Sequence, residues 1–226
     1  MQILIVAATE MEISPLLNFL DKEFDKGDSS FHYYRNECSI HILITGIGLV
    51  ATAYHLGVYL STFSFDLVIN AGIAGSYKQD INIGDVAWVK EDQLAEFGVE
   101  EANGNFTSVF DMGLMDKNSF PFTNQKLISP KTEQHQHLEV VTGLTVQRVH
   151  GFAPSIAVAK KRYNADIETM ESAAFFFACL SHQVPFQAIR AISNFVEPRN
   201  RANWNIPLAI NNLNQYLIQF IEDSQN

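Results

Sequence analysis

Three polar residues stand within a few positions of the ends of apolar segments, where their side chains could do chemistry. Glu12 follows the apolar run 2–8, Asn194 follows the continuous run 186–192, and Glu171 follows a shorter one. α/β enzymes place substrate-binding and catalytic groups at strand ends of this kind. A carboxylate there can act as a general base when partial burial raises its pKa. We predict that Glu171 and Asn194 lie at the carboxyl ends of neighbouring strands and face a common crevice.

Segment 167–194 positions two of these residues. A short strand-like run up to Glu171 gives way to a helical pattern over 170–182, and the run 186–192 is typical of a strand that is covered on both faces. The helix positions predicted to be buried are Ala173, Ala174, Phe177, Ala178 and Leu180.

Glu12 has a structural explanation as well. The run 2–8 has strand character, and Thr9 is suited to cap a helix that continues to about Leu20. Glu10 and Glu12 then lie in the first helical turn, where the helix dipole stabilises carboxylates. We assign Glu10 to this role alone, and for Glu12 the structural and the catalytic role both stay open.

Glycine-containing segments follow two further predicted strands. Gly46 and Gly48 come after the strand 39–45, and segment 72–76 follows the strand 66–71. Glycine allows the backbone to approach a ligand closely, although tight packing of a strand against a helix would favour the same residues. We predict both segments to be turns at strand ends.

The rest of the chain supplies further elements and two irregular regions. Residues 92–124 are rich in aromatic side chains, which could pin this segment to the core or line an apolar pocket for a substrate side group. His135 and His137 have no Cys or acidic partner at metal-ligand spacing, so we predict a solvated loop and no metal site there. The remaining predicted elements are a surface loop over 21–30, strands 31–35, 86–90 and 139–149, a helix ending near Tyr163, and an amphipathic helix over about 207–223.

The composition excludes several classes of function. A formal net charge of −10, with only 15 Lys and Arg, argues against a nucleic-acid surface. The chain has no signal-peptide pattern and no apolar run long enough to span a membrane. Cys38 and Cys179 are too few and too far apart for a disulfide framework. We expect a cytoplasmic protein that forms one domain over residues 1–226, binds a small molecule and contacts neither nucleic acid nor a membrane.

The string from Met170 and Glu171 to Ser193 and Asn194 resembles the signature of the purine nucleoside phosphorylase and methylthioadenosine nucleosidase superfamily. In the nucleosidases an acidic residue, a Met and a Glu are followed at the same distance by Arg-Ala-Ile-Ser-Asp, and this chain has Asn194 in place of that Asp. The resemblance implies an α/β fold: a single-domain, three-layer α/β/α structure with a central sheet that is mixed, twisted and partly barrel-like. It also implies a homodimer or higher homo-oligomer that needs no cofactor.

The resemblance further implies roles in cleaving the N-glycosidic bond of a purine nucleoside. Glu12 would activate the attacking water, Glu171 would accept hydrogen bonds from the ribose hydroxyls, and Asn194 would address the purine edge. The implied substrate-binding residues are Ile73, Ala74, Gly75, Val149, His150, Met170 and Ser193. For His150, contact with the purine and an ordinary place in a turn both stay open. Phosphorolysis would need an anion site, and the carboxylates of the first helix would repel phosphate, so hydrolysis is predicted.

Asn194 also bears on the substrate. Its amide cannot supply a proton, but it can donate to a 6-oxo oxygen while its carbonyl accepts from a protonated N7, a pattern that matches hypoxanthine. Strings within 92–124 resemble those of the futalosine hydrolases, a branch of the superfamily whose nucleoside substrate carries a benzoate-bearing chain. We therefore expect futalosine as the substrate. The alternatives are methylthioadenosine, S-adenosylhomocysteine or inosine as the substrate, and a non-catalytic nucleoside-binding module, although the presence of both Glu12 and Glu171 weighs against the last.

Overall fold

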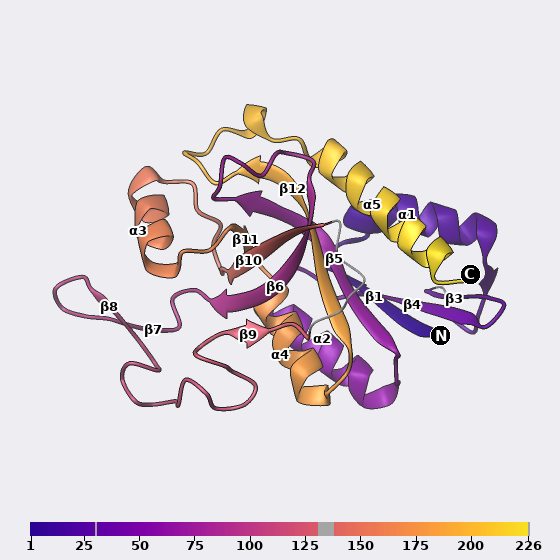
Figure 1. Ribbon diagram of the computed structural model, residues 1–226, viewed down its shortest axis with the longest axis horizontal. Coiled ribbons are helices and arrows are strands. Elements are labelled where there is room, and N and C mark those ends of the chain that lie inside the picture. Colours follow the sequence, from indigo (N-terminus) through magenta and orange to yellow (C-terminus); the bar gives the residue numbers. More distant parts are fainter. Residues whose placement is uncertain (30, 131–137, 226) are drawn as a thin grey trace.

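A ten-stranded mixed sheet forms the centre of the fold and carries helices on both faces (Figure 1). The computed structural model describes residues 1–29, 31–130 and 138–225, so His135 and His137 lie outside the described residues. The strands are β1 (Gln2–Ala7), β2 (Asp25–Lys26), β3 (His32–Arg35), β4 (Cys38–Ile44), β5 (Leu67–Ser76), β6 (Val86–Leu94), β7 (Gly98–Glu100), β8 (Phe106–Ser108), β9 (Leu127–Ile128), β10 (Glu139–Thr145), β11 (Ile167–Thr169) and β12 (Phe186–Phe195). The helices are α1 (Glu10–Glu23), α2 (Leu49–Thr62), α3 (Ala153–Tyr163), α4 (Ser172–His182), α5 (Ile206–Asp223) and the short 3-10 helix η2 (Arg201–Asn203).

Part of the sheet closes on itself. The strand order is β11-β10-β6-β12-β5-β1-β4-β3-β2, and β11 also pairs with β5 through Ile167 opposite Ser76 and Glu168 opposite Gly75. The strands β5, β12, β6, β10 and β11 thereby form a closed ring. Parallel pairs, such as β1 with β5, and antiparallel pairs, such as β12 with β6, occur in the same sheet. The predicted mixed, partly barrel-like sheet is confirmed.

The two faces of the sheet bury separate cores. Along β1, Ile3 and Ile5 join the core beneath α1 and α5, whereas Leu4 and Val6 join the core beneath α2 and α4. This alternation follows from the period of two residues along a strand. In Figure 1 the pair α1 and α5 lies on one side of the sheet and the pair α2 and α4 on the other. The three-layer α/β/α arrangement is therefore confirmed.

Three local predictions are wrong. Segment 72–76 is not a turn but the second half of β5, because β12 and β11 pair with it from both sides. The predicted loop 21–30 contains the end of α1 and the short strand β2, which pairs with β3. Phe177 is 44% exposed rather than buried, since its ring contacts Phe122 of the irregular segment but stays partly open to solvent.

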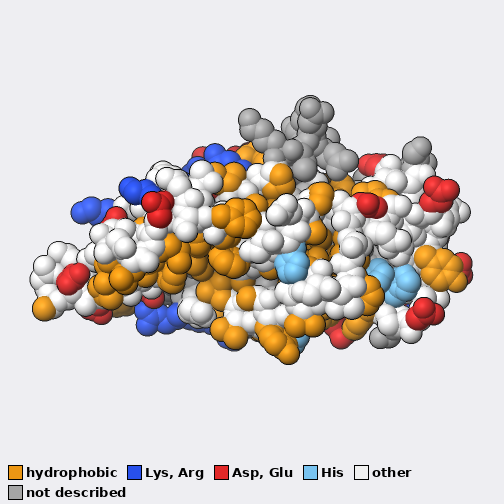
Figure 2. All heavy atoms as spheres, turned by 90° about the horizontal axis from the view of Figure 1, so that it is seen from below, with side chains coloured by type: hydrophobic (Ala, Val, Ile, Leu, Met, Phe, Trp, Pro, Cys, Tyr) orange, Lys and Arg blue, Asp and Glu red, His pale blue; other side chains and the backbone are white. Residues whose placement is uncertain are grey.

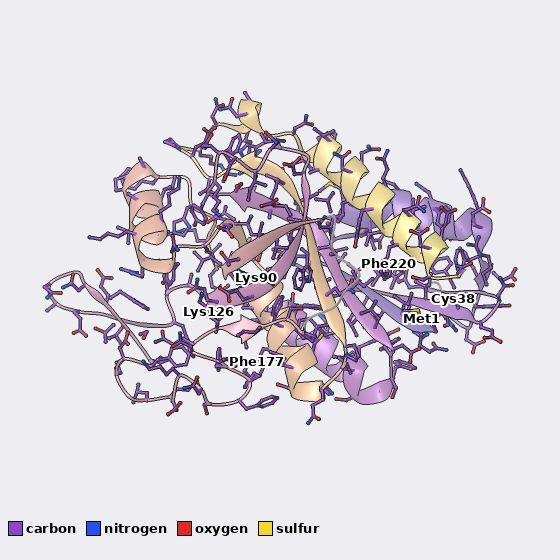
Figure 3. The ribbon with its side chains drawn as sticks, viewed as in Figure 1. Met1, Cys38, Lys90, Lys126, Phe177 and Phe220 are labelled. Carbon is purple, nitrogen blue, oxygen red and sulfur yellow. The ribbon has the colours of Figure 1, made fainter. Side chains whose placement is uncertain are left out.

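The aromatic residues of 92–124 pack against the body of the protein. Phe97 contacts Phe110, Phe110 contacts Phe122, and Phe122 contacts Phe177 of α4, with ring centroids 5.3–6.0 Å apart. Figure 3 shows Phe177 on α4 beside the irregular segment that precedes β9. Of the two alternatives for these side chains, the structure supports anchoring of the segment.

None of the helices in the part of the chain that the structure describes has both the length and the apolar character that a membrane span requires. Cys38 and Cys179 are free and buried.

Candidate active site

A cavity of about 350 Å³ opens at the carboxyl ends of several strands. Its lining comes from the segment after β1, from the second half of β5, from β11 and the residues that follow it, and from the end of β12. All ten residues predicted for the site line it: Glu12, Ile73, Ala74, Gly75, Val149, His150, Met170, Glu171, Ser193 and Asn194. Glu171 and Asn194 therefore share a cavity, as predicted. The strands that carry them are not neighbours, however, since β11 and β12 lie on opposite sides of β5.

Glu12 caps α1 and lines the cavity at the same time. Its Oε2 accepts a hydrogen bond from the backbone N–H of Thr9 at 3.1 Å, as part of a capping box, and another from the Thr9 hydroxyl at 3.0 Å. Its Oε1 accepts from the backbone N–H of Ile73 in β5 at 3.2 Å. These bonds hold the carboxylate in one orientation. Glu10, in the same helical turn, is exposed and is not part of the cavity lining.

Glu171 is the N-terminal cap residue of α4, and its carboxylate reaches across the cavity. Its Oε1 accepts a hydrogen bond of 2.8 Å from the backbone N–H of Gly48, at the start of α2. Burial raises the pKa of Glu171 above its ordinary value, while the Gly48 N–H and the charge of Arg190 oppose the shift. Gly48 has φ of 93°, a conformation that favours glycine.

A buried guanidinium lies behind the two carboxylates. Arg190 of β12 donates from Nη1 to the Asn70 carbonyl and from Nη2 to the Ser172 hydroxyl, both at 2.9 Å. A Cβ atom added to Gly72 would lie 3.1 Å from Glu12 Oε1 and 3.7 Å from Arg190 Cζ, so the glycine leaves room for both groups. Burial lowers the pKa of Arg190, and the charges of Glu171, Glu12 and Asp92 oppose this. Arg190 therefore compensates charge in the site from within the core.

A β-bulge directs Ser193 and Asn194 into the cavity together. Ile192 pairs with Ala74 and Asn194 pairs with Gly75, so Ser193 is the extra residue in β12. Consecutive residues of a regular strand point to opposite faces, and the bulge removes that constraint. Asn194 Nδ2 donates to the Phe195 carbonyl at 2.9 Å, and its Oδ1 lies 2.8 Å from the Ser193 hydroxyl. These contacts determine which end of the amide is the donor.

His150 is held by a buried carboxylate from β11. Its Nδ1 lies 2.7 Å from Glu168 Oε2, and its backbone N–H donates to Glu168 Oε1 at 3.0 Å. The Tyr77 hydroxyl donates to Glu168 Oε2 at 2.6 Å and lies 3.1 Å from His150 Nδ1. Burial, followed by the charge of Glu168, raises the pKa of Tyr77 well above its ordinary range, so its hydroxyl keeps its proton.

Several lining residues carry no assignment from the sequence. Glu168 is the acidic residue that precedes Met170 and Glu171 in the family motif, and Met11 is next to Glu12, so the sequence could have indicated both. No motif in the sequence includes Trp204. The lining residues without an assignment are Ala8, Thr9, Met11, Ile47, Glu168, Thr169 and Trp204. Within the described residues, no group of three or more His, Cys, Asp and Glu side chains has the geometry of a metal site.

A second cavity adjoins the first. It has a volume of about 600 Å³, and Phe106, Arg148 and Arg162 are among its lining residues. His150 lines both cavities.

This chain is similar to a known protein family and to individual proteins within it. Residues 2–222 match the family model described as the phosphorylase superfamily. The futalosine hydrolase of Streptomyces coelicolor is 32% identical over 147 residues, which cover 65% of this chain and 61% of that protein. The futalosine hydrolase of Thermus thermophilus is 30% identical over 173 residues, 76% of each chain.

This chain is also similar to a nucleosidase and to a solved structure. A 5′-methylthioadenosine/S-adenosylhomocysteine nucleosidase of a Geobacillus species is 27% identical over 209 residues, covering 86% of this chain and 85% of that protein. The native structure of futalosine hydrolase of Helicobacter pylori has a TM-score of 0.77 at 17% identity, covering 98% of this chain and 97% of that chain. At this identity, the structural likeness shows the shared fold.

Proposed function

Because this chain belongs to the phosphorylase superfamily, we propose that it hydrolyses the N-glycosidic bond of futalosine and that the cavity beside Glu12, Glu171 and Asn194 is its active site. The futalosine hydrolases and the nucleosidase to which it is similar are N-glycosyl hydrolases of purine nucleosides, which supports this reaction class. The products would be hypoxanthine and the sugar with its benzoate-bearing chain.

The reaction defines three tasks. Cleavage of the bond leaves positive charge on the ribose, so the site must stabilise that charge, accommodate the departing purine and deliver water. Glu171 accepts from the ribose 2′ and 3′ hydroxyls and places negative charge near the developing cation. Glu12, oriented by Thr9 and Ile73, accepts a proton from the attacking water. Asn194 binds the edge of the purine.

The charge of the lining supports water rather than phosphate as the nucleophile. Three carboxylates, Glu12, Glu168 and Glu171, line the cavity, and Arg190 is buried behind it rather than facing the ligand. Their negative charge would repel a phosphate ion, whereas water needs only a general base.

The orientation of the Asn194 amide is the observation that favours hypoxanthine as the purine of the substrate. With one Nδ2 hydrogen bonded to Phe195, the second hydrogen is available to a 6-oxo oxygen, and Oδ1 is available to a protonated N7. A 6-amino purine would present a donor to the amide donor, and this mismatch would leave buried polar groups unpaired. The proposal therefore names a hypoxanthine nucleoside. The apolar side chains of Met11, Ile47 and Trp204 are available to the remainder of the substrate.

The direct test is release of free purine, measured with futalosine, inosine and methylthioadenosine, each with and without phosphate. Hypoxanthine released from futalosine without phosphate is the expected result. Preferred release of adenine from methylthioadenosine would instead support the second candidate, a methylthioadenosine nucleosidase, which the long alignment with the Geobacillus protein favours. Phosphate-dependent release would indicate a phosphorylase, and binding without any release would indicate a non-catalytic module.

We also propose that the active form is a homodimer. Helix α2 exposes Val50, Tyr54 and Val58, four residues apart and therefore on one stripe, and Ile47 continues the stripe to the cavity mouth. Figure 2 shows hydrophobic side chains gathered on the face where α2 and α4 lie. A second copy of the chain on this stripe would cover apolar surface and border the cavity.

Two further proposals concern the whole chain. The strands, apart from the β7–β8 pair, belong to one sheet, and we propose that residues 1–226 fold as one domain. The free, buried thiols of Cys38 and Cys179 suit a reducing compartment, and we propose the cytoplasm.

A further inference from the structure

The proposed site lacks an obvious proton donor for the purine. A hypoxanthine that departs from the sugar takes the electron pair of the N-glycosidic bond, and protonation of its ring stabilises it as it leaves. The amide of Asn194 can hold a protonated N7 but has no proton to give. Glu12 and Glu171 already have roles on the water and the ribose. Among the residues that line the cavity, His150 and Glu168 are the other ionisable side chains.

The contacts of His150 determine where its proton is. Tyr77 has one hydroxyl proton, and the 2.6 Å bond to Glu168 uses it. Nδ1 of His150 therefore faces two acceptor oxygens, that of Glu168 at 2.7 Å and that of Tyr77 at 3.1 Å, and must carry a hydrogen itself. Nε2 is then the ring nitrogen at which a proton is gained and lost, and it carries one when the ring is an imidazolium. No described residue forms a hydrogen bond to Nε2, and His150 lines the cavity.

The position of His150 is suited to the base. Glu168 lies beside Asn194 across Gly75, because a Cβ atom at Gly75 would be 3.2 Å from Asn194 Nδ2 and 3.6 Å from Glu168 Cγ. The imidazole held by Glu168 and the amide that binds the purine edge therefore line the same cavity on either side of Gly75. The His150 and Glu168 side chains are only 9% and 4% exposed, so the pair is shielded from water. Lys160 of α3, 6.0 Å from the Tyr77 ring centroid, is a further charged group nearby.

We propose that His150 is the general acid of the reaction, with Glu168 and Tyr77 as its positioning residues; this rests on the proposed function. As the bond between C1′ and N9 breaks, its electron pair passes to the purine, and N7 takes the proton of His150 Nε2. Water adds to C1′ and gives a proton to Glu12. His150 is reprotonated from solvent as Glu12 releases its proton, so one water is consumed per turnover. The Glu168 carboxylate stabilises the imidazolium before transfer, as a carboxylate does for histidine in other hydrolases.

The experiment compares two leaving groups on the same sugar. His150→Gln and the unmutated protein are assayed with futalosine and with the p-nitrophenyl glycoside of the futalosine sugar. p-Nitrophenolate leaves without protonation, so a lost general acid should affect only the hypoxanthine substrate. We expect kcat for futalosine to fall roughly 10²-fold to 10⁴-fold, and release of p-nitrophenol to stay within about threefold of the unmutated protein.

Two further variants test the positioning residues and the loop. Glu168→Gln removes the charge beside the imidazole, and we expect the same leaving-group dependence in a weaker form. Phe152→Ala alters an exposed neighbour in the same loop that lines the second cavity but not the proposed active site, and should leave both rates unchanged.

The possible outcomes distinguish a failure of the His150 assignment from a failure of the proposed function. Equal loss for both leaving groups in His150→Gln would mean a structural or binding role, and retained hypoxanthine release would mean that another group supplies the proton; either result overturns the assignment alone. An unmutated protein that releases no purine from any nucleoside overturns the proposed function and this assignment with it.

Discussion

The Glu171 carboxylate accepts a 2.8 Å hydrogen bond from the backbone N–H of Gly48, 123 positions earlier in the chain. The bond joins the start of α4 to the start of α2, beside the cavity that Glu171 and Ile47 line. Its other oxygen accepts a longer bond of 3.3 Å from the backbone N–H of Met170, so both bonds hold the carboxylate in one orientation beside the cavity. Replacement by Gln would retain an acceptor for Gly48 but remove the charge.

We therefore expect Glu171→Gln to weaken both substrate binding and turnover, because a ribose contact exists before bond cleavage and strengthens as positive charge develops. Steady-state KM and kcat, with thermal unfolding as a control for folding, measure this. A change in melting temperature alone would identify Glu171 as a structural cap.

The raised pKa of Glu171 predicts the acid side of the pH profile. Protonation neutralises the carboxylate, so kcat/KM should fall as the pH falls through that raised pKa and level off above it. In Glu171→Gln this dependence should be missing. If kcat/KM of the variant still falls at low pH as it does in the unmutated protein, another group causes the fall.

For Glu12→Gln, turnover should fall about 10²-fold or more while ligand binding is largely retained. The amide oxygen can still accept from Thr9 or Ile73, so the melting temperature should change little. Glu10→Gln is the matched control, since it removes a carboxylate from the same helical turn outside the cavity. Near-normal turnover in Glu12→Gln would remove its role as the base.

Asn194→Asp tests whether Asn194 distinguishes a 6-oxo purine from a 6-amino purine. A carboxylate facing a 6-oxo oxygen is repulsive unless it is protonated, and it also loses the donor that binds the Phe195 carbonyl. Cleavage of futalosine should fall relative to its 6-amino counterpart, with the ratio of catalytic efficiencies shifting by roughly 10²-fold. If the ratio does not move, or if the unmutated protein already prefers the 6-amino substrate, Asn194 does not select the base.

Asp92→Asn should change how stability depends on pH. Burial raises the pKa of Asp92 from 3.8 to about 7, and the hydrogen bond from the Thr145 hydroxyl to Oδ1, the charge of Arg190 and backbone hydrogen bonds from Gln93 and Thr145 oppose this only in part. Between these values the folded carboxyl holds a proton that the unfolded one has released, so stability falls as the pH rises through this window, by about 1.4 kcal/mol per pKa unit. Asp92→Asn should not lose stability in this way as the pH rises. Chemical unfolding at pH 5 and pH 8, which should show one transition for one domain, measures the difference; parallel curves for both proteins would contradict it.

Tyr54→Glu should separate the proposed homodimer. A charge in the centre of the apolar α2 stripe would be buried without a partner in the interface. Light scattering on a sizing column should show the mass of a monomer, whereas Val158→Glu, an exposed position on α3, should leave the assembly unchanged. An unmutated protein that is already monomeric would refute the dimer.

Local patterns were enough to predict much of the architecture. The apolar run of β1, the Thr9 cap of α1 and the amphipathic pattern of α5 depend on residues close in sequence, and the structure has these elements within a few residues of the predicted bounds. The spacing from Glu171 to Asn194 similarly identified a strand, helix and strand that bring two polar side chains to one cavity.

Contacts between distant segments decided the rest. The extension of β5 through 72–76 depends on pairing with β11 and β12, and the placement of Ser193 and Asn194 on one face depends on a bulge against β5. The burial of Arg190 behind two carboxylates and the clamping of His150 by Glu168 join residues that are separate in sequence. Hydrophobic periodicity determines which face of an element is buried, but strand register, bulges and buried charge networks depend on the partner segment, which sequence spacing alone does not specify.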